Sequence, residues 1–252
     1  MKRIHILICI MFCIFLAACS KKAEENHSTT KAESTSTADA AEATNNEVAA
    51  DEKLGTKWGD EIDSHVTEVD LKRKTDAPLA EAIVQYADKK YQGKSVNSIS
   101  LAAGKMSFSV VDDHGKNIPM YRVGQTYYLS GREGQSYQLK YENHTGRTFE
   151  VVASVDGVDV INGSEASRSN SGYVLNAHDS LTIEGFRKSD SAVASFTFSQ
   201  PEDSYAANSE HGSIQNAGVI GTVIYELEAP EEEAQPVNKY AQPPNAFPAD
   251  HK

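Results

Sequence analysis

The stretch Thr148–Val160 (TFEVVASVDGVDV) decides the fold of this chain. Most of its residues are apolar or β-branched, and Asp156 and Gly157 interrupt the run. An Asp-Gly pair between two β-branched runs is the strongest short-range signal for a β-hairpin, because both turn positions need a positive φ angle. The stretch therefore predicts two antiparallel strands joined by a two-residue turn.

Short apolar runs recur on both sides of this hairpin, with turn-forming residues between them. Strict alternation over Val96–Leu101 (VNSISL) is typical of a strand with one buried face. The other runs that we expect to form strands are Val66–Leu71, Leu79–Tyr86, Met106–Val111, Ile118–Val123, Tyr127–Leu129, Ser136–Tyr141, Tyr173–Leu175, Ser180–Phe186, Ala192–Phe198 and Gly218–Leu227. Roughly ten short strands without a convincing amphipathic helix predict an all-β sandwich or jelly roll.

One run is ambiguous between helix and strand. Leu79–Lys90 has enough Ala and Glu for a helix, but Ile83, Val84 and Tyr86 favour a strand. Order is expected to begin near Leu54, just before the chain's only tryptophan, Trp58.

The N-terminal segment has the pattern of an export signal. Lys2 and Arg3 precede a nearly continuous apolar run, which ends at Leu16, Ala17, Ala18 and Cys19. These four residues resemble the lipobox of bacterial lipoproteins. The resemblance implies that the Cys19 thiol carries diacylglycerol, that the chain is cut between Ala18 and Cys19, and that the new amino group is acylated.

The apolar run is too short for the roughly 20 residues of a transmembrane helix. Two or more acyl chains hold a protein firmly on a bilayer, so a triacylated Cys19 is expected to be a permanent anchor. Ser20 follows it. In lipoproteins of Gram-negative bacteria, a residue other than Asp at this position usually means transfer to the outer membrane, so the resemblance favours its periplasmic face.

Composition divides the chain into four parts. Residues 1–18 are the expected signal peptide, and residues 19–53 are the lipidated cysteine with a polar linker that is too poor in large apolar residues to fold. Residues 54–228 are the expected sandwich domain. The acidic and Pro-rich residues 229–252 cannot pair in a sheet and are expected to be disordered.

Cysteine content and charge restrict the possible chemistry. Two of the three cysteines, Cys9 and Cys13, lie inside the signal, so no disulfide is expected in the mature protein. The formal net charge of the 252-residue chain is −12, which argues against binding nucleic acid through charge. No nucleophile elbow, phosphate loop or zinc-type spacing occurs, so we expect neither a cofactor nor a metal.

Three polar groups could carry chemistry, but a structural role is favoured for each. Adjacent Asp112, Asp113 and His114 have metal-binding side chains, yet they lie in an expected turn, where neighbouring side chains diverge. His178 and Asp179 could form an acid–base pair, but they lie in a loop between strands. Asp156 and Asp159 lack the dense oxygen spacing of a calcium loop.

The main candidate pair is Arg187 and Asp203. Arg187 follows an apolar strand and Asp203 opens a loop between two core strands, so their side chains could meet in a bidentate ion pair. Such a pair more often fastens a loop than recognises a ligand. A sugar-binding face is the other candidate, since aromatic rings stack on the apolar faces of sugars. Aromatic residues in alternating strands more often belong to the core. The residues of this candidate face are Tyr121, Tyr127, Tyr128, Tyr137 and Tyr141.

Several motifs between Tyr137 and Tyr225 resemble a domain that recurs in uncharacterised bacterial exported proteins. They are SVDGVDV (154–160), GYVL (172–175), GFRKS (185–189), VASFTF (193–198), DSYA (203–206) and GVIG (218–221), and Gly55–Gly59 also fits. This resemblance implies that the region folds as a domain, but it implies no activity. We therefore expect a membrane-anchored, non-enzymatic binding or structural module whose partner is an envelope protein or a glycan. The alternatives are a hydrolase on a jelly roll and a carbohydrate-binding module.

Overall fold

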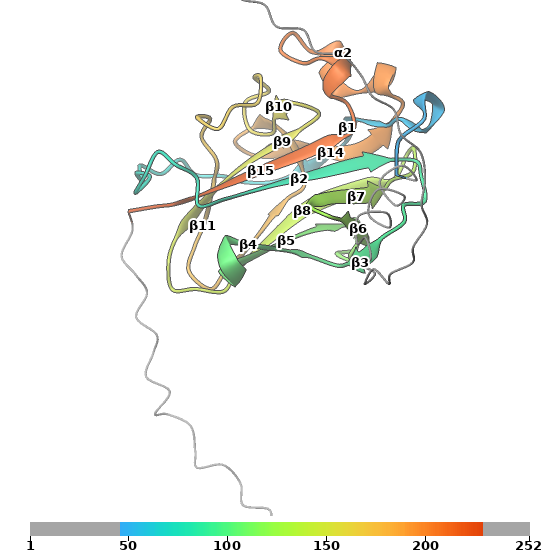
Figure 1. Ribbon diagram of the computed structural model, residues 1–252. Coiled ribbons are helices and arrows are strands. Elements are labelled where there is room, and N and C mark those ends of the chain that lie inside the picture. The colour runs from blue at the N-terminus through green and yellow to red at the C-terminus, as the bar shows by residue number, and fades with distance from the viewer. Residues whose placement is uncertain (1–45, 229–252) are drawn as a thin grey trace, which may run out of the picture. The chain divides into compact units, whose positions relative to one another are not determined.

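The computed structural model describes residues 46–228, and these form an all-β sandwich of two packed sheets (Figure 1). The predicted fold class is confirmed, with more strands than the roughly ten expected from the sequence. The expected signal peptide (1–18), Cys19 with the linker up to residue 45, and the tail (229–252) lie outside the described residues. No helix in the described part of the chain is long and apolar enough to span a membrane.

The larger sheet has eight strands in the order β10-β9-β15-β2-β7-β6-β3, and β11 also pairs with β9. All its pairings are antiparallel except that of β2 with β7. Its strands are β2 (Ala80–Ala87), β3 (Lys94–Val96), β6 (Met120–Val123), β7 (Thr126–Ser130), β9 (Phe149–Val155), β10 (Val158–Asp159), β11 (Tyr173–Leu175) and β15 (Val219–Glu226).

The smaller sheet has seven strands, five of them in the order β1-β14-β8-β5-β4. Its strands are β1 (Gly55–Asp63), β4 (Ile99–Leu101), β5 (Met106–Val111), β8 (Ser136–Asn143), β12 (Ser180–Ile183), β13 (Gly185–Ser189) and β14 (Ala192–Ser199). Among residues 46–228 the short helix η1 (Ala50–Glu52) precedes β1, and four more lie between strands: η2 (Ala102–Gly104), η3 (Pro201–Asp203), α2 (Tyr205–Asn208) and η4 (Ile214–Asn216).

Strands β8 and β14 pair over only two residues each and then diverge. The gap between them is filled by β12, which pairs with β8, and by β13, which pairs with β14. The chain turns between them at Glu184 and Gly185. A Cβ atom on Gly185 would lie 1.9 Å from the Ala194 carbonyl oxygen, so this turn requires glycine.

The core lies between the two sheets and follows the alternation of the strands. Along β8, every second side chain, from Tyr137 to Asn143, is buried. On the facing sheet, Val84, Val151 and Ile224 are also fully buried. Because burial of apolar area is the main favourable term in folding, this core holds the sheets together without a disulfide.

The predicted hairpin is confirmed. Val155 of β9 pairs with Val158 of β10, and the two residues between them have φ angles of 54° (Asp156) and 75° (Gly157). The ambiguous run at residues 79–90 is also a strand, β2, as its β-branched and aromatic residues indicated.

Three boundary predictions were wrong. The run at residues 66–71 is not a strand, because the chain there leaves β1 and crosses to the other sheet. The alternating run at residues 96–101 divides into β3 and β4, which belong to different sheets. The fold also includes residues before Leu54: the Asn46 side chain exchanges two hydrogen bonds with the Gln92 backbone, and Asn46 is buried.

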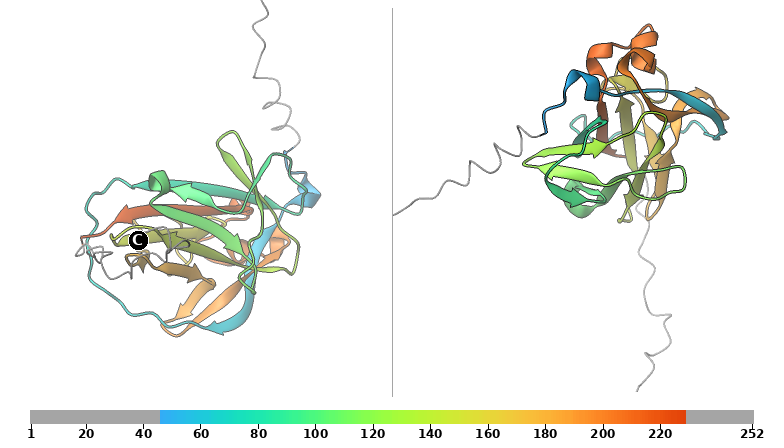
Figure 2. Two further views of the ribbon diagram at one scale, coloured as in Figure 1. Left: turned by 90° about the horizontal axis from the view of Figure 1, so that it is seen from below. Right: turned by 90° about the vertical axis from the view of Figure 1, so that its right-hand side faces the viewer.

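We call residues 64–79, between β1 and β2, the strap. Its first end is fixed to the β13–β14 turn, where the amides of Ser64 and Val66 donate to the carbonyls of Ser191 and Asp190. Its second end is fixed to β15 by Lys74 and Leu79. The strap therefore runs from one sheet to the other along one end of the sandwich (Figure 2).

Candidate functional site

A polar cluster lies buried between the two sheets, where several strands begin or end, and consists of Thr56, Tyr86, Tyr137 and Asp156. One Asp156 carboxylate oxygen accepts from the Tyr86 hydroxyl at 2.6 Å and the other from the Thr56 amide at 2.7 Å. The Thr56 hydroxyl lies 2.7 Å from the hydroxyls of both Tyr86 and Tyr137. Since Tyr86 donates to the carboxylate, Thr56 donates to Tyr86 and Tyr137 donates to Thr56. The cluster is therefore a single chain of hydrogen bonds that ends on Asp156.

Asp156 also accepts from the Gly218 amide at 2.9 Å, so it joins the hairpin to β1, β2 and the start of β15. Burial raises the pKa of Asp156 to about 6, although the hydrogen bonds from Tyr86, Thr56 and Gly218 act to lower it. Burial likewise raises the pKa of Tyr86 and Tyr137 well above the usual range for tyrosine, so both stay neutral donors. This carboxylate has no exposed surface, and its role is to hold strands together.

The raised pKa of Asp156 predicts a stability that depends on pH. Because the folded pKa of about 6 lies above the usual aspartate value of 3.8, the part of the stability that depends on protonation of Asp156 is fully present below pH 3.8 and is lost as the pH rises through 6, whereas the hydrogen bonds to its carboxylate remain. The difference of about two pKa units corresponds to about 3 kcal/mol. We expect carboxyl ¹³C NMR to give an apparent pKa near 6 for Asp156. An ordinary pKa below 4.5 would contradict the prediction. Glu226, whose pKa is lowered by Lys74, contributes in the opposite direction.

A series of aromatic rings leads from this cluster to the surface. Tyr137 stacks on Phe196 with ring centroids 5.3 Å apart, and Phe196 meets Phe186 edge to face at 5.0 Å. Phe186 contacts Tyr205 at 4.8 Å, and Tyr205 stacks on Trp58 at 4.9 Å with an angle of 27° between the rings. Trp58 is 42% exposed. The series thus ends in an aromatic surface at the edge strand β1.

We call this surface the Trp58 platform: Trp58 and Tyr205, with the open hollow of about 510 Å³ that they line. The other residues of the hollow are Lys57, Asp203, Ser204 and Asn208. Trp58 lies opposite Phe196 in the β1–β14 ladder, which fixes its backbone. Tyr205 opens α2, beside β1 at the top of Figure 1.

The helix that carries Tyr205 is held by its own cap. The Ser204 hydroxyl accepts from the Ala207 amide at 3.1 Å and donates to the Pro201 carbonyl at 2.7 Å. The Asn208 side chain donates to the carbonyls of Glu202 and Ser204. Because the N-cap is satisfied and Ser204 is buried, the Tyr205 ring is preorganised.

Arg187 lies in a different place, in a cleft of about 580 Å³ between the strap and strands β11–β13. Its Nε donates to the Tyr173 hydroxyl at 2.9 Å, and its Nη1 and Nη2 donate to the carbonyl and hydroxyl oxygens of Ser64. Nη1 also donates to the Ser189 carbonyl. The guanidinium therefore fastens the start of the strap.

The predicted pairing of Arg187 with Asp203 is wrong. Strand β13 alternates, so Phe186 faces Tyr205 while Arg187 points to Tyr173 and the strap. Asp203 is exposed at the rim of the Trp58 platform, and its carboxylate has no hydrogen-bond or ion-pair partner among residues 46–228. Arg187 fastens the strap instead, and Asp203 takes no part in that contact.

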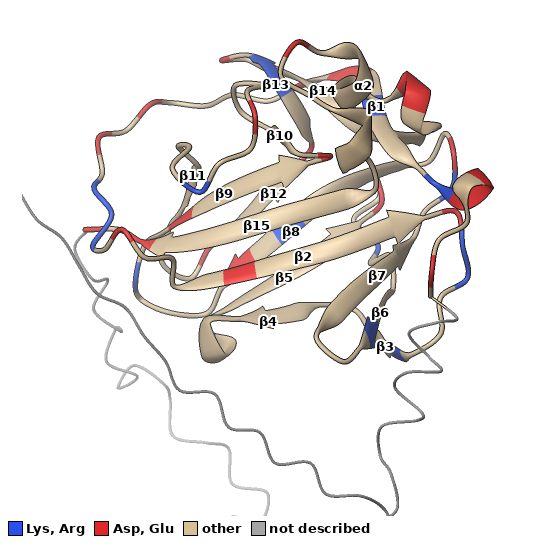
Figure 3. Ribbon diagram, turned by 45° about the horizontal axis from the view of Figure 1, so that its top comes forward, with Lys and Arg blue, Asp and Glu red and all other residues tan. Residues whose placement is uncertain are grey.

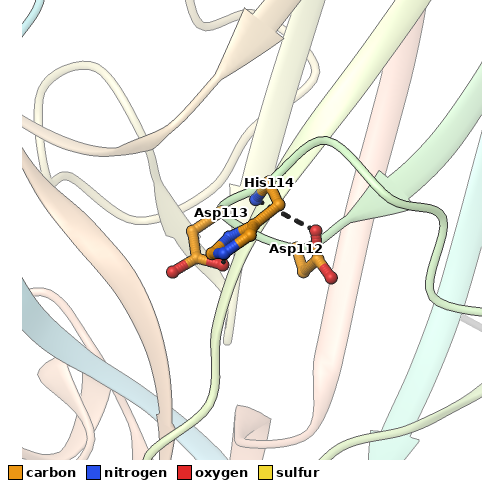
Figure 4. Close-up of side chains that lie close together, drawn as sticks. All are labelled: Asp112, Asp113 and His114. Carbon is orange, nitrogen blue, oxygen red and sulfur yellow. Dashed lines mark hydrogen bonds and ion pairs between the residues drawn. The ribbon is translucent and has the colours of Figure 1, made fainter.

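Asp112, Asp113 and His114 form the one group of three His, Cys, Asp or Glu side chains within metal-binding distance in the described part of the chain (Figure 4). The turn explains their positions, since one Asp112 oxygen accepts from the amides of His114 and Lys116. Asp113 and His114 pair in the solvent, and they are 63% and 82% exposed in their side chains.

The remaining polar candidates have structural positions. Asp159 is buried, and one of its oxygens accepts from the amides of Ile161 and Asn162, which shapes the loop after the hairpin. His178 has a φ angle of 54° in the turn before β12, and its amide donates to the Thr145 carbonyl. Neither residue lines the Trp58 platform.

The tyrosines considered as a sugar-binding face do not form one surface. Tyr137 and Tyr141 are fully buried in the core. Tyr121, Tyr127 and Tyr128 are half-buried on the paired strands β6 and β7 of the larger sheet. Tyr205 belongs to the DSYA motif beside the candidate Asp203, but nothing in the sequence indicated that its ring packs on Trp58, which was interpreted only as a marker of order. The signal that could have drawn attention to Trp58 was a large aromatic residue between two glycines in a short strand.

No protein family model, curated protein or solved structure matches this chain. The lipobox resemblance and the resemblance to an exported domain stay predictions.

Proposed function

We propose that this protein is a lipid-anchored lipoprotein of the bacterial cell envelope, on the periplasmic face of the outer membrane, and that its sandwich binds an envelope partner without catalysis. The observation that supports the binding role is the Trp58 platform. A large exposed aromatic ring, held by packing from below, is the kind of residue that dominates binding energy at interfaces. The Asp203 carboxylate at its rim, which has no hydrogen-bond or ion-pair partner among residues 46–228, supplies a directional contact.

A non-enzymatic role is favoured by the positions of the ionisable groups. Asp156, the carboxyl with the most raised pKa among residues 46–228, is enclosed in the core. In the cleft at Arg187, the guanidinium is engaged in hydrogen bonds that fasten the strap. The hydrolase alternative would need nucleophile and base side chains that converge on a cavity, and no observation favours it.

The anchor is tested by replacing Cys19. We expect the native protein to incorporate labelled palmitate and to partition into detergent, and Cys19→Ala to do neither, because the thiol and the cleavage site are then lost. Absence of label on the native protein would contradict a lipid anchor.

The binding role is tested by sedimentation of the full-length protein with detergent-washed envelope fragments. We expect Trp58→Ala to weaken binding at least about tenfold, because it removes the aromatic anchor. The matched control is Tyr121→Ala, which truncates a half-buried aromatic residue on the other sheet and should bind normally. Equal binding by all three proteins would refute the platform as the binding surface.

A further inference from the structure

We propose that the Trp58 platform binds a neutral polysaccharide, with one pyranose ring lying against Trp58 and its hydroxyl groups reaching Asp203 and Lys188. This inference rests on the proposed function and names the class of partner. It is carried by three features of the described residues: the aromatic surface, the polar groups beside it and the mixed charge of its rim.

The aromatic surface is held in place from below. Tyr205 stacks on part of Trp58 and is itself supported by Phe186, so these rings form a continuous series of contacts down to the core. A pyranose presents C–H groups on one face, which pack against the apolar surface of an aromatic ring. Because the stack is already ordered, such a ligand would lose little free energy to the ordering of protein side chains.

The polar groups at the rim are of the kind that hydroxyl groups need. Among residues 46–228, the Asp203 carboxylate has no hydrogen-bond or ion-pair partner, and Asp203 lines the hollow. The Lys188 ammonium lies 5.9 Å from the Trp58 ring centroid and is the donor beside it. A carboxylate accepts hydrogen bonds and an ammonium donates them. A sugar hydroxyl does both, whereas an apolar side chain of a protein partner would leave both rim groups unused.

The charges around the ring favour a neutral ligand. Lys57 and Asp203 have opposite signs, and Lys188 reaches the Trp58 ring with its Nζ 5.9 Å from the ring centroid. Lys188 also pairs with Glu61. Blue and red positions are interspersed over the molecule in Figure 3, without a face of one sign in that view. A strongly charged polymer would meet a like charge at this rim.

The Lys188–Glu61 pair lies at the surface, where solvent screens ion pairs and they contribute little to stability. The side chain of Lys188 can therefore move aside when a ligand covers the ring, and its ammonium remains available as the donor.

The test uses the full-length protein in detergent and exploits Trp58 as the chain's only tryptophan. Cellohexaose and chitohexaose are titrated while tryptophan fluorescence is followed, and a charged oligosaccharide, heparin hexasaccharide, serves as the comparison. We expect a saturable change with at least one of the neutral hexasaccharides and none with heparin. Calorimetry on Trp58→Ala, which lacks the fluorophore, should show affinity for the neutral ligand reduced at least about tenfold.

The controls separate the ligand class from the proposed function. Trp58→Phe should retain part of the affinity, and Tyr121→Ala all of it, with circular dichroism confirming that each variant is folded. Binding to envelope fragments should survive protease treatment of the fragments. If Trp58→Ala bound the saccharide as tightly as the native protein, the Trp58 platform would not be the saccharide-binding site. The saccharide proposal would be wrong if no neutral saccharide bound and if binding to envelope fragments were lost after protease treatment. If that envelope binding were also lost on Trp58→Ala, the proposed binding role of the Trp58 platform would still hold, with a protein as the partner.

Discussion

Replacement of Asp156 by Ala is expected to lower the free energy of unfolding by about 3–5 kcal/mol at neutral pH, because it leaves several buried donors without an acceptor. The donors are the amides of Thr56 and Gly218 and the hydroxyl of Tyr86. Each is buried or part-buried and belongs to a different strand or strand end, so the loss affects β1, β2 and β15 together. Urea unfolding with linear extrapolation measures the change.

The matched control is Asp113→Ala. Asp113 is exposed in the turn after β5, and its carboxylate pairs only with the exposed His114 among the described residues. Surface changes of this kind stay within about 0.5 kcal/mol. If Asp156→Ala also stayed within that range, the buried cluster would not hold the sandwich together.

Gly185→Ala is expected to cost at least about 3 kcal/mol, at the upper end of overpacking effects, because the added methyl group meets backbone instead of a flexible side chain. The new Cβ would lie 1.9 Å from the Ala194 carbonyl oxygen, so β13 and β14 would have to separate. That separation would disturb the place where β13 fills the gap between the diverging strands. Thermal unfolding of the variant should show a melting temperature lower by many degrees.

Gly221→Ala provides the comparison for this effect. Gly221 also lies inside a strand, β15, but its Cβ would approach only the Ser154 hydroxyl, which can rotate away. We expect a change below about 1 kcal/mol for this variant, since backbone atoms need not move. Equal destabilisation by both variants would mean that backbone crowding at Gly185 is not the cause.

Local patterns in the sequence predicted most strands because strand pairing here follows alternation and turn chemistry. The Asp156-Gly157 turn and the run that became β5 needed no tertiary information. The strap could not be predicted in the same way. Its residues 66–71 mix apolar and polar side chains like a strand, but the chain crosses here from one sheet to the other and pairs with neither.

The candidate site was harder to predict because it joins segments far apart in the chain. Trp58 comes from β1 and Tyr205 from α2, and they meet only because Phe186 of β13 lies beneath Tyr205. The Arg187–Asp203 pairing was a reasonable inference from charge. It failed because alternation along β13 directs Arg187 away from the side that Phe186 and Tyr205 occupy.

The most direct test of the account is photo-cross-linking from the rim of the Trp58 platform in intact cells. A benzophenone amino acid replaces Asp203 in one protein and the exposed Asp113 in a control. The account predicts covalent adducts with an envelope component from position 203, none from position 113, and loss of the adducts when Trp58→Ala is added. Identical adducts from both positions, or adducts from position 203 that persist without Trp58, would contradict it.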